Sequence, residues 1–308
     1  MEMPHAPQFD STLSLLNQGY TLVLHTCREL ETDVYQGRLM LQKTIFMMGE
    51  EAARLFYDQT RFMRHGAMPR RIQKTLLGVD GVQSLDDEPH RHRKHLFVQQ
   101  LMIPEKIEAL ANLTHQTLRE AASEWEHTSR FTLFPELQLI LCKSVCQWAA
   151  VPLDAVEAKQ RASDLGAMIE SGGRVGIEHW QGRLARKRSE KWIGGLIRQV
   201  RSGQLDVPPD SVLYAVAMHR DLQGELLPLN IAAVELLNIV RPTVAIARFM
   251  IFGMAALHEH PEYAHAIAQN HDAFLQMYVQ EVRRFYPFFP QIAARVKNEF
   301  QWRGYTFQ

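Results

Sequence analysis

The longest apolar segment of the chain lies between residues 229 and 258 and has a helical period. The positions that return to similar faces are Ile231, Val234, Leu237, Val240, Val244 and Met250. The other faces are also largely apolar, and a helix of this kind is normally buried in a large domain or in a membrane. Glu235, Arg241 and Arg248 leave no uninterrupted apolar run of about 18 residues. The pattern therefore predicts a buried core helix and no membrane span.

Apolar positions elsewhere predict a mainly helical protein with small β elements near its start and its end. The alternation over residues 33–48 predicts a short hairpin, and residues 293–307 alternate as a strand–turn–strand. Further helices are expected at residues 11–28, 49–58, 104–126, 135–150, 154–171, 177–201, 210–219, 262–270 and 272–286. Because the chain has no Gly/Ser/Pro-rich linker or internal repeat, residues 1–308 are expected to form a single domain without an internal boundary.

Composition and charge narrow the possible functions. The formal net charge is zero, which gives no electrostatic basis for binding nucleic acid or an anionic membrane. The first ten residues are polar and lack the features of a secretory signal, so a cytoplasmic location is expected. Three cysteines, Cys27, Cys142 and Cys146, are too few for a disulfide framework. The last two are four residues apart without a neighbouring ligand cluster, so we expect buried thiols and no metal site.

Two residues in the middle of the apolar helix are costly there. Pro242 lacks a backbone donor and its ring clashes with the carbonyl group near Asn238, so a kink is expected. Arg241 keeps its proton in proteins and requires an anion when it is buried. That anion is either a protein carboxylate such as Glu235 or part of a ligand, and the residues alone leave both alternatives open.

Three further segments combine residue types that occur in binding sites. Glu281 and Arg284 lie three apart on one helical face and can form an ion pair, although this spacing is common on surface helices. Residues 90–94 (HRHRK) are either a solvated basic turn or a cluster of donors for carboxylate or phosphate groups. Residues 285–290 (FYPFFP) either line a site or belong to the core. By contrast, the basic side of helix 177–201, which includes Arg186, is typical of a solvated face.

Taken in this order, these segments resemble the haem-thiolate fold of the cytochromes P-450. The chain is most similar to the fatty acid-hydroxylating peroxygenase branch of that superfamily, and within it to the bacterial fatty acid α-hydroxylase. The matching stretches are residues 66–69, 72–78, 81–83, 90–94, 232–236, 240–247 and 279–290. The resemblance extends over all 308 residues, and 240–247 (VRPTVAIA) and 279–290 (VQEVRRFYPFFP) are long enough to be specific.

This resemblance implies a hydrogen peroxide-dependent hydroxylase of long-chain fatty acids that needs no redox partner. Arg241 stands where most of the superfamily carries an acid–alcohol pair, and in the peroxygenase branch it binds the carboxylate of the fatty acid. That carboxylate acts as the general acid–base group that moves the proton of the peroxide. Gln83 matches a glutamine of hydroxylating relatives and Leu77 a leucine of the α-hydroxylase, which favours α-hydroxylation. The substrate-binding residues that the resemblance implies are Arg241, Pro242, Gln83, Leu77, Ala245 and Phe288.

The cofactor that the resemblance implies is haem b. His90 and Lys94 resemble the pair that contacts the haem propionates, and Glu281 with Arg284 resembles a buried structural pair under the haem. The axial ligand of the family is a cysteine in a glycine-rich loop near the carboxyl terminus, and no cysteine of this chain matches it. We therefore expect an incomplete P-450 domain whose 308 residues supply no ligand to the iron and are inactive by themselves.

Two alternative functions stay open. One is a conventional haem monooxygenase that draws electrons from redox partners, against which Arg241 and Pro242 argue. The other is a non-catalytic helical scaffold that binds a fatty acid. A smaller departure from the family lies at Asp86 and Asp87, where relatives have Asp-Gly, and it is expected to stiffen the loop that carries Gln83.

Overall fold

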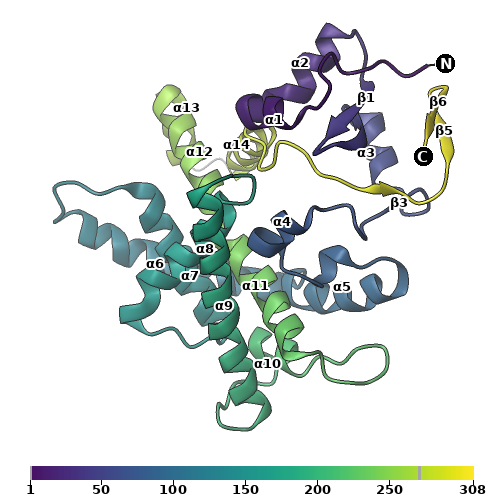
Figure 1. Ribbon diagram of the computed structural model, residues 1–308. Coiled ribbons are helices and arrows are strands. Elements are labelled where there is room, and N and C mark those ends of the chain that lie inside the picture. Colours follow the sequence, from purple (N-terminus) through teal and green to yellow (C-terminus); the bar gives the residue numbers. More distant parts are fainter. Residues whose placement is uncertain (1, 270–271) are drawn as a thin grey trace. The chain divides into compact units, whose positions relative to one another are not determined.

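The computed structural model describes residues 2–269 and 272–308. It divides into two compact units, one formed by residues 1–69 with 287–308 and the other by residues 70–286. Each unit is considered by itself, and the expected single domain stays a prediction. Helices dominate residues 70–286, and the short strands lie in the other unit, near the start and the end of the chain as the sequence predicts (Figure 1). The end of the expected helix 262–270, at Asn270, lies outside the described residues.

Residues 70–286 are almost entirely helical. The elements are α4 (Arg70–Ile72), η2 (Gln73–Leu77), η3 (Val82–Ser84), α5 (Asp87–Leu101), α6 (Pro104–Trp125), α7 (Leu133–Trp148), α8 (Ala155–Glu170), α9 (Ile177–Arg201), α10 (Val212–Ala217), α11 (Leu229–Ala245), α12 (Ala247–Glu259), α13 (Pro261–Ala268) and α14 (Asp272–Phe285). Local chemistry explains several starts. Asp154 caps α8, because its side chain accepts a hydrogen bond from the backbone of Val156 at 2.7 Å, and Ser211 caps α10, because its hydroxyl accepts one from the backbone of Tyr214.

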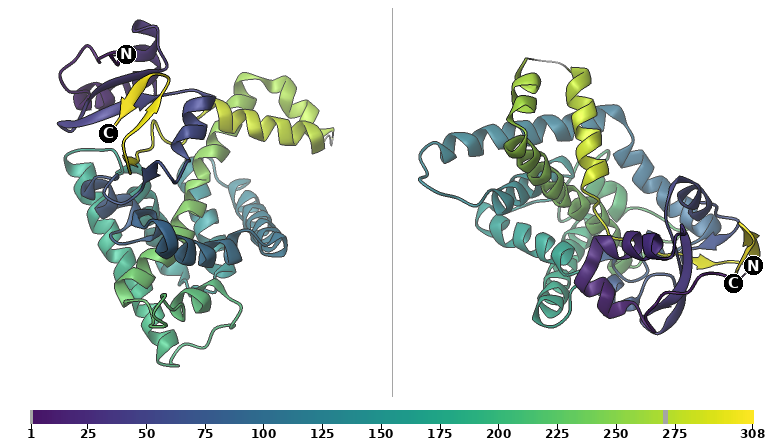
Figure 2. Two further views of the ribbon diagram at one scale, coloured as in Figure 1. Left: turned by 90° about the vertical axis from the view of Figure 1, so that its right-hand side faces the viewer. Right: turned by 90° about the horizontal axis from the view of Figure 1, so that it is seen from above.

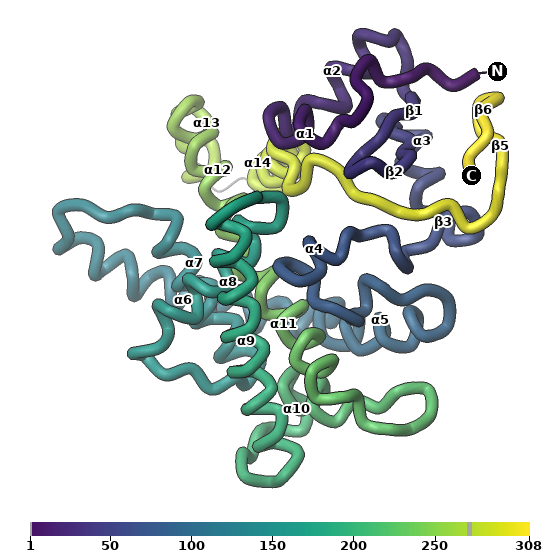
Figure 3. Tube along the Cα trace, viewed as in Figure 1, coloured from purple at the N-terminus to yellow at the C-terminus, as the bar shows by residue number. Residues whose placement is uncertain are grey.

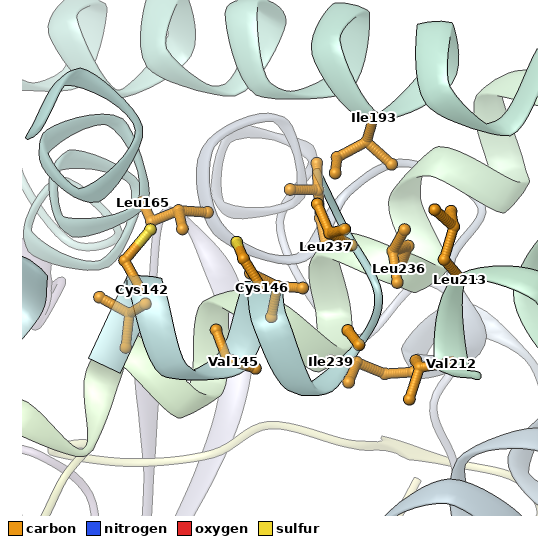
Figure 4. Close-up of a cluster of buried hydrophobic side chains, with 14 of the residues drawn as sticks. Cys142, Val145, Cys146, Leu165, Ile193, Val212, Leu213, Leu236, Leu237 and Ile239 are labelled. Carbon is orange, nitrogen blue, oxygen red and sulfur yellow. The ribbon is translucent and has the colours of Figure 1, made fainter. Parts of the chain in front are cut away.

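Helix α11 is the centre of this unit. It packs against α7, α8, α9 and α10, and its residues from Ala232 to Val240 are all buried. The core around it contains Leu165 of α8, Ile193 of α9 and Leu237 of α11, each without exposed surface (Figure 4). Cys142 and Cys146 also lie in this core as free, fully buried thiols, which confirms their predicted packing role.

The apolar segment after residue 229 is interrupted by a short break. Pro242 lies inside α11, which ends at Ala245, and α12 begins at Ala247. The break therefore follows within one turn of the proline, as its missing donor predicts. The combined segment Leu229–Glu259 is long and apolar enough to cross a membrane, a test that core helices of soluble proteins also pass. Helices α12, α13 and α14 pack on one another beyond the break (Figure 2).

The other unit combines short helices with three two-stranded antiparallel sheets. Its elements are α1 (Thr12–Gln18), η1 (Gly19–Thr21), α2 (Leu22–Glu29), β1 (Val34–Leu39), β2 (Gln42–Met47), α3 (Glu50–Phe56), β3 (Phe62–Met63), β4 (Arg295–Val296), β5 (Phe300–Trp302) and β6 (Tyr305–Phe307). The predicted hairpins β1–β2 and β5–β6 are both present. The last segment of the chain returns to the first through the β3–β4 pair (Figure 3).

The tip of the β1–β2 hairpin is strained. Met40 and Leu41 form its two-residue turn with φ values of 53° and 63°, a region that favours glycine or asparagine. Two side chains hold this turn, because Thr12 Oγ1 accepts from the Met40 backbone at 2.7 Å and Asp10 Oδ2 accepts from Leu41 at 2.6 Å. The hydrogen bonds that Asp10 accepts lower its pKa, those from Thr12 most and that from the backbone of Leu41 less.

The substitution Leu41→Gly is expected to raise the free energy of unfolding by about 1 kcal/mol, because glycine adopts a positive φ without steric cost. The matched control is Lys43→Gly, which places glycine at an exposed strand position and should destabilise the hairpin. Chemical denaturation measures both, and a stability loss with Leu41→Gly would show that the turn carries no strain.

The substitution Leu237→Ala is expected to lower the free energy of unfolding by about 2–5 kcal/mol, because the side chain is fully buried beside α7 and α9. Leu184→Ala is the control, since Leu184 on α9 is 55% exposed and its loss should change stability by less than about 0.5 kcal/mol. Equal effects of the two substitutions in thermal or urea denaturation would contradict the placement of α11 at the core.

Candidate functional site

Arg241 is a buried cation without a carboxylate partner among the described residues. Its residue surface is 5% exposed, and Nη2 donates a hydrogen bond to Asn238 Oδ1 at 3.3 Å. The Nε atom is buried and has no partner among the described residues. Burial, and to a lesser degree the neighbouring Arg186, lowers the pKa of Arg241 to about 9, so the side chain is still cationic at neutral pH.

The alternative in which Glu235 neutralises Arg241 is wrong. Glu235 instead forms an ion pair with Arg93 of α5, with Nη1 and Oε1 2.8 Å apart. Burial raises the pKa of Glu235 above its ordinary value, and the Arg93 guanidinium opposes that rise. Because this carboxylate is already paired with Arg93, no carboxylate among the described residues neutralises Arg241.

Asn238 joins Arg241 to Gln83. Its Nδ2 atom donates to Gln83 Oε1 at 3.1 Å, while its Oδ1 atom accepts from Arg241. Gln83 lies on the short η3 turn, and Gly81 allows this turn to approach α11. A Cβ atom at Gly81 would lie 2.9 Å from Val234 Cγ1 and 3.1 Å from both Asn238 Nδ2 and Gln83 Oε1. The structure therefore brings together two of the predicted substrate-binding residues, Gln83 and Arg241.

Leu77 ends a π-helical turn, η2, that is held by a second buried arginine. Arg186 of α9 is 2% exposed and donates from Nη1 to the carbonyl oxygen of Leu76 at 2.9 Å. Its Nε atom pairs with Glu190 at 2.6 Å. A Cβ atom at Gly78, where φ is 88°, would collide with Arg186 Nη2 and with Val234. The expectation that Arg186 lies on a solvated face is wrong, because its side chain turns inward to bond this loop.

Two predicted residues follow Arg241 on α11 and differ in exposure. Pro242 is exposed, whereas Ala245 is 6% exposed and lies one turn beyond Arg241. The small methyl group of Ala245 leaves more space beside Arg241 than a larger side chain would. Phe288 lies in the other unit, where its carbonyl oxygen accepts from the Tyr20 hydroxyl at 2.9 Å. Its predicted contact with an acyl chain stays a prediction.

The residues predicted to contact haem lie on α5 and α14. His90 is 7% exposed and Lys94, one turn further along α5, is exposed. Glu281 and Arg284 form the expected ion pair, with Oε1 and Nη2 2.6 Å apart. Their side chains are 60% and 67% exposed, which differs from the expected burial. Both side chains line an open hollow on α14.

The described residues would suit the substrate side of a haem site but would not supply its iron ligand. Arg241 has a buried nitrogen without a partner among the described residues, and Asn238 links Arg241 to Gln83, which suits a site that binds an anion. The proximal ligand of a haem-thiolate protein is a deprotonated cysteine. Burial raises the pKa of Cys27 to about 11, and a hydrogen bond to Cys142 together with burial raises that of Cys146. None of these thiols fits the iron, and the described residues contain no metal-ligand cluster.

Sequence reasoning missed three residues around Arg241, namely Arg93, Asn238 and Arg186. The contact of Asn238 with Arg241 could have been predicted, because Asn238 lies three positions before Arg241 on the same helical face. Arg93 was noticed only as part of the basic segment 90–94, and its partner lies 142 positions away. Nothing in the sequence distinguishes Arg186 from the exposed arginines near it.

No protein-family model matches the chain, but solved structures do. Cytochrome P-450SP alpha in complex with (R)-ibuprophen is 43% identical, with a TM-score of 0.94 over 97% of this chain and 73% of that chain. Cytochrome P-450EX alpha with myristic acid is 39% identical, with a TM-score of 0.92 over 100% and 74%. A variant of cytochrome P-450 OleT with arachidonic acid is 28% identical, with a TM-score of 0.95 over 100% and 73%. By sequence and by fold, the chain belongs to the CYP152 peroxygenase family of the cytochromes P-450.

Proposed function

We propose that the protein uses hydrogen peroxide to hydroxylate the α-carbon of long-chain fatty acids, in the cytoplasm and without a redox partner. The observation that carries the proposal is the Arg241 guanidinium, which is buried and has no carboxylate partner among the described residues. A fatty acid carboxylate supplies the missing charge, and an apolar acyl chain suits a helix whose buried residues are mostly apolar. Relatives that bind myristic acid and arachidonic acid support this substrate class.

The residues around Arg241 would bind and orient the substrate. The Nε atom of Arg241 is available to donate to a carboxylate oxygen, while Nη2 is held by Asn238. Arginine binds a carboxylate directionally, so the α-carbon is held at a defined place relative to Gln83. The bound carboxylate accepts a proton from the peroxide and returns it, which makes the substrate the general acid–base group. The preference for α-hydroxylation rests on the resemblance at Gln83 and Leu77.

Haem b, when bound, supplies the iron centre at which the peroxide oxygen is activated and transferred to carbon. His90 and Lys94 would hold its propionates, and Ala245 would leave room on its distal side. Since Cys27, Cys142 and Cys146 do not fit the iron, we expect residues 1–308 by themselves to bind fatty acid without hydroxylating it. This observation also favours the second candidate function, a non-catalytic fatty acid-binding scaffold. Turnover of myristic acid by residues 1–308 with haem and peroxide would contradict that candidate.

The substitution Arg241→Gln is expected to raise the dissociation constant for myristic acid about 100-fold, because it removes a charge-assisted pair worth about 3 kcal/mol. Arg248→Gln is the control, since Arg248 lies one element later and pairs with Glu170. Isothermal titration calorimetry measures both variants. Unchanged affinity with Arg241→Gln would refute the proposed carboxylate site.

Myristic acid affinity is also expected to depend on pH through Arg241. The pKa of Arg241 is about 9 in the substrate-free protein, so the cation that binds the carboxylate is present below pH 9 and is lost as the pH rises above it. The affinity should be constant between about pH 7 and 8 and should fall tenfold per unit well above pH 9. An affinity that is the same at pH 8 and pH 10.5 would contradict a role for this guanidinium.

A further inference from the structure

An ion pair behind the site connects α5 with α11. Glu235 has no exposed side-chain surface and Arg93 has 11%, and they are joined at 2.8 Å between Oε1 and Nη1. A buried pair of this kind contributes little net stability, because both charges lose water on folding. Removing only one partner is costly, however, because the other charge is left buried and unpaired. The net stability of the pair therefore does not explain its place beside the site.

Glu235 has one further donor, which belongs to the site. Its Oε2 atom accepts from Asn238 Nδ2 at 3.4 Å, and the nearby backbone of Val82 lowers the pKa of Glu235. Val82 directly precedes Gln83 on η3. Through Asn238, this carboxylate connects α5 and α11 with the turn that carries Gln83.

The charges on either side of Asn238 determine which way its amide points. One end of the amide faces the Glu235 carboxylate, which only accepts hydrogen bonds, and the other faces the Arg241 guanidinium, which only donates them. The NH₂ group must therefore point to Glu235 and the carbonyl group to Arg241. A flipped amide would place two acceptors together at Glu235 and two donors together at Arg241.

The same orientation acts on Gln83. The NH₂ group of Asn238 also donates to Gln83 Oε1 at 3.1 Å. Since its oxygen is engaged in this way, the amide nitrogen of Gln83 is the end that can donate to a ligand. The order of donors and acceptors runs without conflict from Arg93 through Glu235 and Asn238 to both Gln83 and Arg241.

We propose that the Arg93–Glu235 ion pair is a positioning device that fixes the amide of Asn238 and thereby aims Gln83 and Arg241 at the substrate carboxylate. This inference rests on the proposed function, because it assumes that Arg241 binds that carboxylate. Arg93 and Glu235 are positioning residues, which act through Asn238. The inference predicts that the negative charge of Glu235, and not only its shape, sets fatty acid affinity.

The test compares the fatty acid affinity of Glu235→Gln with that of Asp164→Asn in residues 1–308. Asp164 is 1% exposed and pairs with Arg188, so its substitution also neutralises a buried paired carboxylate, but on α8 and outside the chain of hydrogen bonds. Calorimetry should show that Glu235→Gln raises the dissociation constant for myristic acid about tenfold, the effect of losing one hydrogen bond to a charged group. Asp164→Asn should leave it within about twofold. Equal effects of both variants would overturn the proposal.

A second measurement needs no substrate. The ¹⁵N-labelled side-chain amide of Asn238, assigned by its loss in Asn238→Ala, should give one sharp pair of proton signals in the unmodified protein. Glu235→Gln should broaden or double these signals, because the amide can then flip, and Asp164→Asn should not alter them. Identical signals in Glu235→Gln would overturn the proposal, whether or not Arg241 binds fatty acid.

If Glu235→Gln fails to fold, two substitutions of Arg93 test the same proposal. Arg93→Lys retains the charge beside Glu235 and should keep myristic acid affinity within about threefold, whereas Arg93→Met should weaken it about tenfold. Equal affinity in these two variants would overturn the proposal. If Arg241→Gln leaves affinity unchanged while the Asn238 signals respond as predicted, the proposed function fails and the orientation of the amide stands.

Discussion

Arg241 is a cation at neutral pH on a helix whose buried residues are mostly apolar, and moving a guanidinium from water into such surroundings costs several kcal/mol. The structure supplies one amide acceptor from Asn238, and Glu235 is already occupied by Arg93. Arg186, another buried cation, makes the position still more positive. Asn238 holds the guanidinium of Arg241 in place by a hydrogen bond, while Glu235, the nearby carboxylate, is paired with Arg93 and does not neutralise it. By charge, that arrangement favours the binding of an anion.

The sequence was sufficient to predict the parts of the fold that depend on local patterns. The helical period after residue 229, the break caused by Pro242 and both hairpins are properties of short segments, and the structure has each of them. The turn at Met40 and Leu41 shows the limit. Its positive φ values are stabilised by Asp10 and Thr12, some 30 positions earlier. The turn itself contains no glycine or asparagine from which a positive φ could be predicted.

Within the site, the sequence indicated the cation and not its surroundings. Arg241 is conspicuous because a charge beside a proline is costly in a core helix. The Arg93–Glu235 pair joins residues that are 142 positions apart, and Arg186 reaches Leu76 across 110 positions. Such contacts follow from the packing of α5 and α9 against the rest of their unit, which no local period encodes. The left-handed φ of 50° at Asp87 was likewise visible only in the structure.

The missing counter-ion of Arg241 also has a consequence for the lifetime of the protein in a cell. A ligand that binds only the folded state stabilises it, by about 2.7 kcal/mol when its concentration is 100 times its dissociation constant. The empty form retains the full desolvation cost of Arg241, so it unfolds more often and is exposed to proteases more often than the form with fatty acid bound. Substrate supply would then regulate the amount of enzyme as well as its rate, with proteolytic turnover removing molecules for which no fatty acid is present.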